Sequence, residues 1–210
     1  MKKLITLMCT MSLLSGCSTF YLNQGMKAPN RGFDDKLPNL EAVFSNAESL
    51  KNFTSEDNFV QVNNPMANRF YREVETNLID EYDEGEKKGY LVLKPIISTA
   101  GFNSKRFLYI FLGVFTGFVA PLLGAPIDVI EGFSELELRV LNSNGKLVKK
   151  YSAEASVKNK LGVYYGGCDS LASQGKNCFD KASWEAYEKA LGDIIEQVYR
   201  DRNYLRKKLN

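Results

Sequence analysis

The sequence contains no histidine, and only one tryptophan, six prolines and four cysteines among its 210 residues. The absence of histidine excludes Ser-His-Asp triads, histidine general bases and histidine-ligated metal sites. The sequence also lacks a glycine-rich phosphate loop and a nucleophile motif. It therefore predicts no catalytic residue, no cofactor and no metal site, and it argues against an enzyme.

Two pairs of carboxylates are the remaining candidates for acid–base chemistry of the kind that glycoside hydrolysis uses. Asp80 and Glu84 lie in the charged end of a predicted helix. Glu135 and Glu137 are two residues apart on a predicted strand, so both are expected to face solvent. We expect neither pair to be catalytic.

The first 17 residues are ordered like a bacterial export signal. Two lysines are followed by an apolar run from Leu4 to Leu14, which is too short to span a membrane comfortably. The next residues, Leu14-Ser15-Gly16-Cys17, resemble the lipobox of bacterial lipoproteins. In that family the signal is cut before the cysteine, whose thiol takes a diacylglycerol and whose new amine is acylated, commonly with palmitate. The resemblance implies a signal peptide over residues 1–16 and lipidation of Cys17, whereas the alternative is a secretory signal with a chance cysteine.

Two further features bear on where the mature chain acts. In enterobacteria-like lipoproteins, a residue other than aspartate after the lipidated cysteine directs transport to the outer membrane, and Ser18 occupies that position here. The resemblance therefore implies a cell-envelope location, at the outer membrane. Loss of Lys2 and Lys3 with the signal would change the net charge from +2 to zero. A neutral chain gives no reason to expect a nucleic-acid partner.

The four cysteines differ in their expected fates. Cys9 lies within the signal and Cys17 at the lipidation site, which leaves Cys168 and Cys178 in the mature chain. Outside the cytoplasm an even pair of cysteines is expected to oxidise, and the polar, turn-rich segment between them closes easily into a loop. We therefore predict a disulfide between Cys168 and Cys178. A zinc site is the alternative, but two cysteines provide too few ligands.

The hydrophobic pattern predicts an α+β domain: a small antiparallel sheet with helices packed on one face. Residues 17–57 are assigned to the lipid anchor and tether, and residues 58–210 to a single domain. We expect helices in 39–50, from about Pro65 to Tyr82, and from about Trp184 to the C-terminal region. We expect strands over 59–62, 90–98 and 162–166, and a hairpin over 134–157. Pro95 indicates an edge position or a bulge in the second strand, and Asn144-Gly145 indicates the turn of the hairpin.

An apolar segment interrupts this pattern, because no charged residue occurs from Phe107 to Ile127. Such a run is long enough to cross a bilayer as one helix. However, Lys105 and Arg106 would precede it on the non-cytoplasmic side, against the positive-inside rule. Glycines and prolines also break it, at Gly113, Gly117, Pro121, Gly124 and Pro126. Three structures remain open: a transmembrane helix, a bent helical hairpin that dips into the leaflet holding the lipid, or a segment buried in the core or against another subunit.

If the hairpin meets a membrane, its aromatic side chains suit the interface and the two preceding cations suit lipid phosphates. The predicted membrane or partner contacts are Lys105, Arg106, Phe107, Tyr109, Phe111, Phe115 and Phe118.

The end of the segment, Ala125-Pro126-Ile127-Asp128-Val129-Ile130-Glu131-Gly132, resembles small bacterial lipoproteins that carry Pro-x-Asp after a hydrophobic run. This resemblance implies no known activity, and we expect Asp128 to cap or turn the chain there. The hypothesis is a non-enzymatic accessory or structural protein of the envelope, with a membrane contact and an envelope protein partner. The alternative is a binder or carrier of lipid or another apolar ligand that uses residues 107–127.

Overall fold

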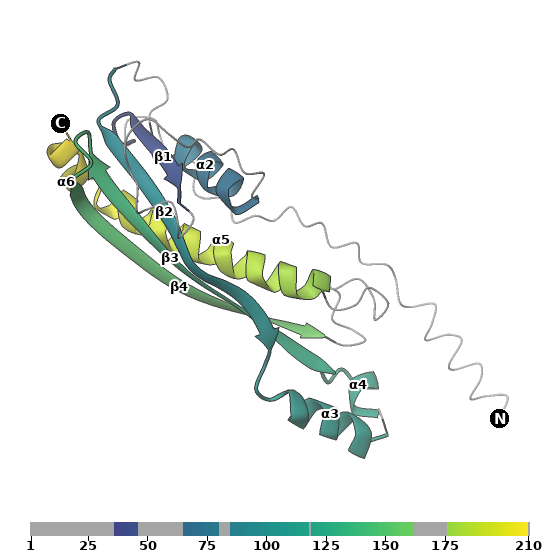
Figure 1. Cartoon of the computed structure of the whole chain (residues 1–210). Coiled ribbons are helices and arrows are strands. Elements are labelled where there is room, and N and C mark those ends of the chain that lie inside the picture. The colour runs from purple at the N-terminus through teal and green to yellow at the C-terminus, as the bar shows by residue number, and fades with distance from the viewer. Residues whose placement is uncertain (1–35, 46–64, 80–84, 118, 162–175, 210) are drawn as a thin grey trace.

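The computed structural model of the chain describes residues 36–45, 65–79, 85–117, 119–161 and 176–209. Its described elements form a single four-stranded sheet with helices packed against one face, so the predicted α+β class is confirmed (Figure 1). The strands are β1 (Leu40–Phe44), β2 (Gly89–Phe102), β3 (Asp128–Asn142) and β4 (Leu147–Leu161). The helices are α2 (Pro65–Asn77), α3 (Arg106–Phe115), α4 (Val119–Leu122), α5 (Lys176–Arg200) and α6 (Arg202–Leu209).

The sheet is open and mixed, with the strand order β1-β2-β3-β4. Strands β2, β3 and β4 form a long antiparallel meander, whereas β1 pairs parallel with β2 along the other edge. The expected antiparallel sheet is therefore extended by one parallel strand. Strands β2, β3 and β4 run well beyond β1, so one end of the sheet is three strands wide and bears α3 and α4 (Figure 1).

Residues 40–44 form β1, and the prediction of a short helix at this place is wrong. The residues Leu40, Ala42 and Phe44 alternate along the strand and contribute to the core. Their backbone pairs with residues 89–93 of β2. Because that pairing satisfies the hydrogen-bonding groups of the β2 edge, a distant partner decides the conformation of this ambiguous segment.

Helix α2 begins at Pro65 as predicted but ends at Asn77, before the predicted boundary at Tyr82. The chain leaves the helix because Ile79 forms an isolated parallel bridge with Leu37. This bridge joins the end of α2 to the segment that leads into β1. Residues 80–84, which include the carboxylates of Asp80 and Glu84, lie outside the described residues, as do the predicted strands over 59–62 and 162–166.

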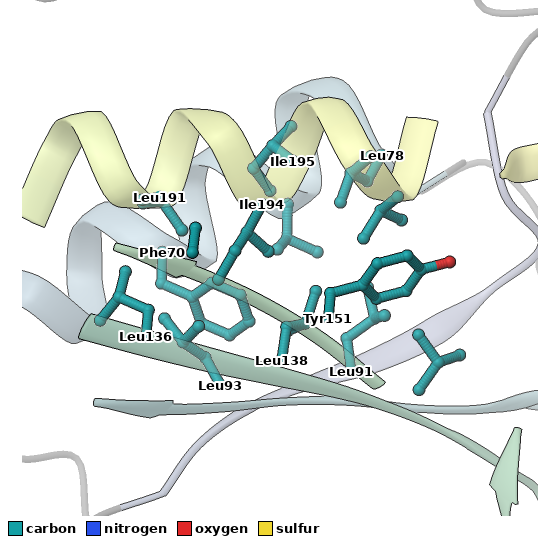
Figure 2. Close-up of a cluster of buried hydrophobic side chains, with 14 of the residues drawn as sticks. Phe70, Leu78, Leu91, Leu93, Leu136, Leu138, Tyr151, Leu191, Ile194 and Ile195 are labelled. Atoms are coloured by element: carbon teal, nitrogen blue, oxygen red, sulfur yellow. The ribbon is translucent and has the colours of Figure 1, made fainter. Parts of the chain in front are cut away.

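The hydrophobic core lies between the sheet and the helix layer formed by α2 and α5 (Figure 2). Leucines of the central strands β2 and β3 point from the sheet toward Leu191, Ile194 and Ile195 of α5. Phe70 of α2 completes the cluster. The predicted helical spacing in the C-terminal segment and the predicted alternation in β3 both place apolar side chains in this layer, so the two patterns are confirmed.

Two local features of the meander agree with the sequence. The register of β2 against β3 shifts between Pro95 and Ile97, which is the bulge expected at a proline that cannot donate a ladder hydrogen bond. The β3–β4 hairpin turns at the predicted place, and Gly145 has a φ of 73°. The connection between Asn142 and Leu147 is longer than a two-residue type I′ turn, because the Asn142 side chain accepts hydrogen bonds from two backbone amides within it.

The C-terminal segment is two helices rather than one, with a break at Asp201. After the break, Leu205 and Leu209 of α6 are buried in the core, so the tail is only partly solvated. Arg206 donates through Nε to the backbone carbonyl of Lys36 at 2.8 Å. Helix α6 therefore packs at the end of the sheet where the described chain begins.

Candidate functional site

Helices α3 and α4 project from the end of the sheet where β2 stops and β3 starts (Figure 1). They belong to the apolar segment, and residues 107–123 are called the apolar tip below. Its exposed large side chains are Phe107, Leu108, Ile110, Phe111, Leu112, Val114, Phe115, Val119, Leu122 and Leu123. The alternative that this segment is buried in the core is therefore wrong for the described residues. The expected glycine- and proline-broken helical hairpin is what the structure shows.

The degree of exposure within the apolar tip is unusual for side chains of this kind. Phe107, Phe115 and Leu123 are 84%, 79% and 83% exposed. The exposed residues of α3 surround most of its circumference, and Gly113 is its only residue that is buried. Contiguous apolar surface of this sort marks a site that meets lipid, a protein or a ligand.

The turn between α3 and α4 involves two residues with special roles, Thr116 and Gly117. Thr116 donates through its hydroxyl to the carbonyl of Leu112 at 2.8 Å and accepts from the amide of Ala120 at 3.2 Å. Gly117 follows with a φ of 57°, a left-handed conformation that favours glycine at a helix end. The amides of Thr116, Gly117 and Val119 also donate to carbonyls within the tip, and such internal pairing favours entry into an apolar phase.

A polar clamp holds the root of the apolar tip, where its two ends meet the sheet. The Arg106 Nε lies 3.0 Å from Asp128 Oδ2, and the guanidinium carbon lies 3.7 Å from the centre of the Phe102 ring. Asn103 donates through its side-chain amide to Glu131 at 2.8 Å. These contacts join residues 102–106, at the end of β2 and the start of α3, to the first residues of β3, and they hold the root of the tip against the sheet.

The side chains expected to contact a membrane have different surroundings. Lys105 is exposed, and its amide donates to Asn103 Oδ1 at 2.9 Å. Arg106 forms an ion pair with Asp128 at the root of the tip, so a lipid phosphate would have to share this cation with the clamp. Phe107, Phe111 and Phe115 are exposed, and the last two rings stack with centroids 5.8 Å apart. Tyr109 is half-buried, and the side chain of Phe118 lies outside the described residues.

The root clamp is a feature that the sequence analysis did not identify. We expected Asp128 to cap or turn the chain, and its Oδ1 does accept from the amide of Val129 at 2.8 Å. Its ion pair with Arg106 was not expected. The sequence does contain a signal for this ion pair, because Arg106 and Asp128 are the charged residues directly before and after the uncharged run.

The predicted cysteine sites are placed only in part. Cys178 is buried in the first turns of α5, in a small cluster with Ile130 and Ala182 near the root of the tip. Cys168 and the predicted lipidation site at Cys17 lie outside the described residues. The lipidation and the disulfide therefore stay predictions.

The Glu135 and Glu137 pair was the strand candidate for acid–base chemistry. Glu137 is buried rather than facing solvent, and Arg139 Nε and Lys150 Nζ each lie 2.6 Å from its carboxylate oxygens. Burial acts to raise the pKa of Glu137, but the hydrogen bonds and charges of Lys150 and Arg139 outweigh it and hold the pKa below its usual value. A carboxylate held ionised between two cations is a poor general acid.

Two further properties of the described residues concern membrane-spanning helices and metal ions. None of the helices described is both long and apolar enough to cross a membrane. Among the same residues, no group of three or more cysteine, aspartate and glutamate side chains is arranged to hold a metal ion. An open hollow between β4 and α5 is lined by polar and charged side chains, including Glu154, Asp193 and Arg200.

Comparisons with known proteins give limited information. No protein-family model matches the chain, and no curated protein matches it. Among solved structures, the chain is similar to a protein from Caulobacter crescentus CB15 described as a candidate lipoprotein, with 16% identity, a TM-score of 0.37, and coverage of 71% of this chain and 87% of that one. It is also similar to a minor lipoprotein from Acinetobacter baumannii, with 8% identity and a TM-score of 0.38. That match covers 81% of this chain and 95% of the Acinetobacter chain. At TM-scores below 0.5 these similarities assign neither a family nor a function.

Proposed function

We propose that this protein is a non-enzymatic, lipid-anchored accessory protein of the bacterial envelope, held at the outer membrane by Cys17, and that its apolar tip enters the lipid leaflet. The observation that carries the proposal is the exposure of ten large apolar side chains on α3, α4 and Leu123. No charged side chain interrupts this surface. Lipid is a partner that would cover such a surface around most of a helix.

The energetics favour insertion over exposure to water. Removing a Val, Leu, Ile or Phe side chain fully from water contributes about 1.5–3 kcal/mol. Ten partly exposed side chains therefore provide several kcal/mol in favour of an apolar phase, even if each gains only a fraction of that range. Helix α3 has ten residues and is about 15 Å long. That length matches one leaflet of a hydrocarbon core about 30 Å thick.

The lipid anchor and the apolar tip complement one another. A single acyl chain binds a membrane weakly and reversibly, whereas the diacylglycerol and the acylated amine expected on Cys17 together hold firmly. In the proposed protein the acyl chains on Cys17 provide the anchor, and the apolar tip provides a second contact that holds the domain in a defined place. An accessory role of this kind also predicts an envelope protein partner, which affinity purification from detergent-solubilised membranes should recover.

The experiment uses residues 17–210 with Cys17→Ser, so that the tip is tested without acyl chains and without the apolar run of the predicted signal. Vesicles of phosphatidylethanolamine and phosphatidylglycerol are floated through a density gradient with this protein and with a Phe111→Asp/Phe115→Asp variant. We expect the aspartates to lower the vesicle-bound fraction at least about tenfold, because a charged side chain in the leaflet is unfavourable by a few kcal/mol. Both phenylalanines are exposed, so the variant should fold.

The matched control is Phe111→Leu/Phe115→Leu, which keeps the apolar character and should keep binding. Insertion depth is read from quenching of a Phe115→Trp variant by brominated lipids, with the native Trp184 as the baseline. Equal flotation of the aspartate and leucine variants would refute insertion. The alternative function as a carrier of lipid or another apolar ligand would instead show a one-to-one lipid complex in native mass spectrometry and no flotation.

A further inference from the structure

The apolar tip and the start of the described chain lie at opposite ends of the sheet (Figure 1). The first strand begins at Leu40, which pairs with Gly89, the first residue of β2. The tip follows Phe102, the last residue of β2. The 14 residues of β2 extend about 45 Å at 3.2–3.4 Å per residue. The tether from Cys17 therefore joins the domain about 45 Å from the place where the apolar tip begins.

The end of the sheet that receives the tether, called the tether end, carries exposed lysines from three parts of the chain. Lys88 precedes β2, Lys146 lies in the β3–β4 turn, and Lys207 and Lys208 lie on α6. The register places these parts together, because Gly89 pairs with Asn142, whose amide donates to the Lys146 carbonyl. Helix α6 joins them through its neighbour Asp201, which pairs with Lys149 of β4.

The acidic side chains at the tether end do not balance these lysines. Glu41 is paired with Lys87 at 2.7 Å, and Asp201 is paired with Lys149. Glu86 and, near the end of α2, Glu75 are further exposed carboxylates, against four exposed lysines. Clustered lysines suit anionic headgroups, and each contributes about 1 kcal/mol near an anionic surface.

The length of the tether restricts how the domain can stand on its membrane. Nineteen peptide steps join Cys17 to Lys36, which gives a maximum reach of about 65 Å and a relaxed span of about 24 Å. If the domain stood upright with its apolar tip down, the tether would have to run back along the whole sheet, over about two thirds of its maximum reach. If it stood with the tether end down, the apolar tip would remain in water.

We infer that the domain lies with its long axis along the leaflet that holds the acyl chains of Cys17, with the apolar tip inserted at one end and the tether-end lysines on anionic headgroups at the other. This inference rests on the proposed function. The arrangement satisfies both contacts and leaves the tether relaxed. It assigns Lys88, Lys146, Lys207 and Lys208 to the recognition of anionic lipid, a role distinct from that of the tip.

The test measures the thickness of the protein layer. The lipidated full-length protein is reconstituted in a supported bilayer that contains phosphatidylglycerol, and neutron reflectometry gives the layer profile. A domain of one sheet and one helix layer lying flat should form a layer about 20–25 Å thick, whereas an upright domain should extend about 45 Å or more. We expect the thin layer for the natural sequence, and a thicker one in about 0.5 M salt, which screens the headgroup contact.

The variant Lys207→Glu/Lys208→Glu should lift the tether end and thicken the layer, whereas the matched Lys207→Arg/Lys208→Arg control should keep it thin. Both lysines are exposed, so neither variant should disturb the core. A thick layer for the natural sequence would overturn the inference, as would a thin layer for the glutamate variant. Clustering of two vesicle populations would show that the tip enters an opposing membrane, which also overturns it.

Failure of this inference is distinguishable from failure of the proposed function. If the Phe111→Asp/Phe115→Asp variant loses flotation while the natural protein forms a thick layer, the tip inserts but the domain stands upright. If that variant floats like its leucine control, the proposed function itself fails, and the orientation on the membrane fails with it.

Discussion

The guanidinium of Arg106 lies between the ring of Phe102 and the carboxylate of Asp128, 3.7 Å from the ring centre and 3.0 Å from Oδ2. The three residues come from the two chain ends that enter and leave the apolar tip. Asp128 is buried, and the Arg106 side chain is partly exposed. This contact ties both ends of a segment without charges of its own to the end of the sheet.

Replacing Asp128 with asparagine should loosen the apolar tip without unfolding the sheet. The asparagine can still accept the Val129 amide but loses the charge that holds Arg106, so we expect a loss of about 1 kcal/mol or less in global stability. Hydrogen exchange followed by mass spectrometry should show several-fold faster exchange in α3, with β3 and β4 unchanged. The control is Lys87→Gln, which removes a 2.7 Å ion pair with Glu41 at the other end of the sheet. Equal exchange in the two variants would show that the clamp does not order the tip.

Replacing Gly132 with alanine should strongly destabilise the domain. A β-carbon at this position of β3 would lie 2.0 Å from the backbone oxygen of Ala182 in α5, so the helix would have to move away from the sheet. We expect a loss of at least about 2 kcal/mol in the free energy of unfolding, measured by urea titration. The matched control is Gly101→Ala on the neighbouring strand, where a β-carbon would meet nothing within 4 Å. Similar midpoints for the two variants would contradict the close helix–sheet contact.

Acid should destabilise the natural protein more than a Glu137→Gln variant. The pKa of Glu137 is lowered in the folded state, so its ionisation stabilises the fold above the ordinary carboxyl pKa of about 4.3, and this contribution is lost as the pH falls through the folded-state pKa. Asp201 is shifted in the same direction, mainly by its hydrogen bond with Lys149, so the variant should retain some acid sensitivity. Urea midpoints between pH 7 and pH 3 test this, and parallel pH curves for both proteins would refute it.

Cys168 and Cys178 should be joined in the protein isolated from the envelope. Iodoacetamide labelling under denaturing conditions should modify neither cysteine before reduction and both after it, as read by mass spectrometry. Reduction should lower the free energy of unfolding by roughly 2–3 kcal/mol, the value expected for a loop of about ten residues. A Cys178→Ala variant should lose the same stability and no longer respond to reductant. Labelling of both residues without reductant would show that the pair is free.

Local sequence patterns were sufficient for much of the fold. The 3.6-residue spacing in α2 and α5 and the alternation in β3 identify faces that the core then uses, since both periods are properties of the backbone alone. Pro95 and Asn144-Gly145 located a bulge and a turn for the same reason. Gly132 carried a weaker signal, because a glycine inside a strand indicates either a bulge or a close backbone approach.

The apolar tip shows a property that local sequence patterns do not determine, namely whether a segment is covered by the rest of the domain. The glycines and prolines in residues 107–127 favour short helices joined by turns over one long helix, since their effects act within a few residues. Whether the helices are covered depends on the strands on either side, β2 and β3, which pair with each other beyond the end of β1 and carry the segment away from the core. The tertiary structure likewise decided that residues 40–44 are a strand, that Arg106 meets Asp128, and that tether and tip lie at opposite ends. Each of these relations joins residues far apart in the chain, and only the packing of the whole domain sets the distance between them.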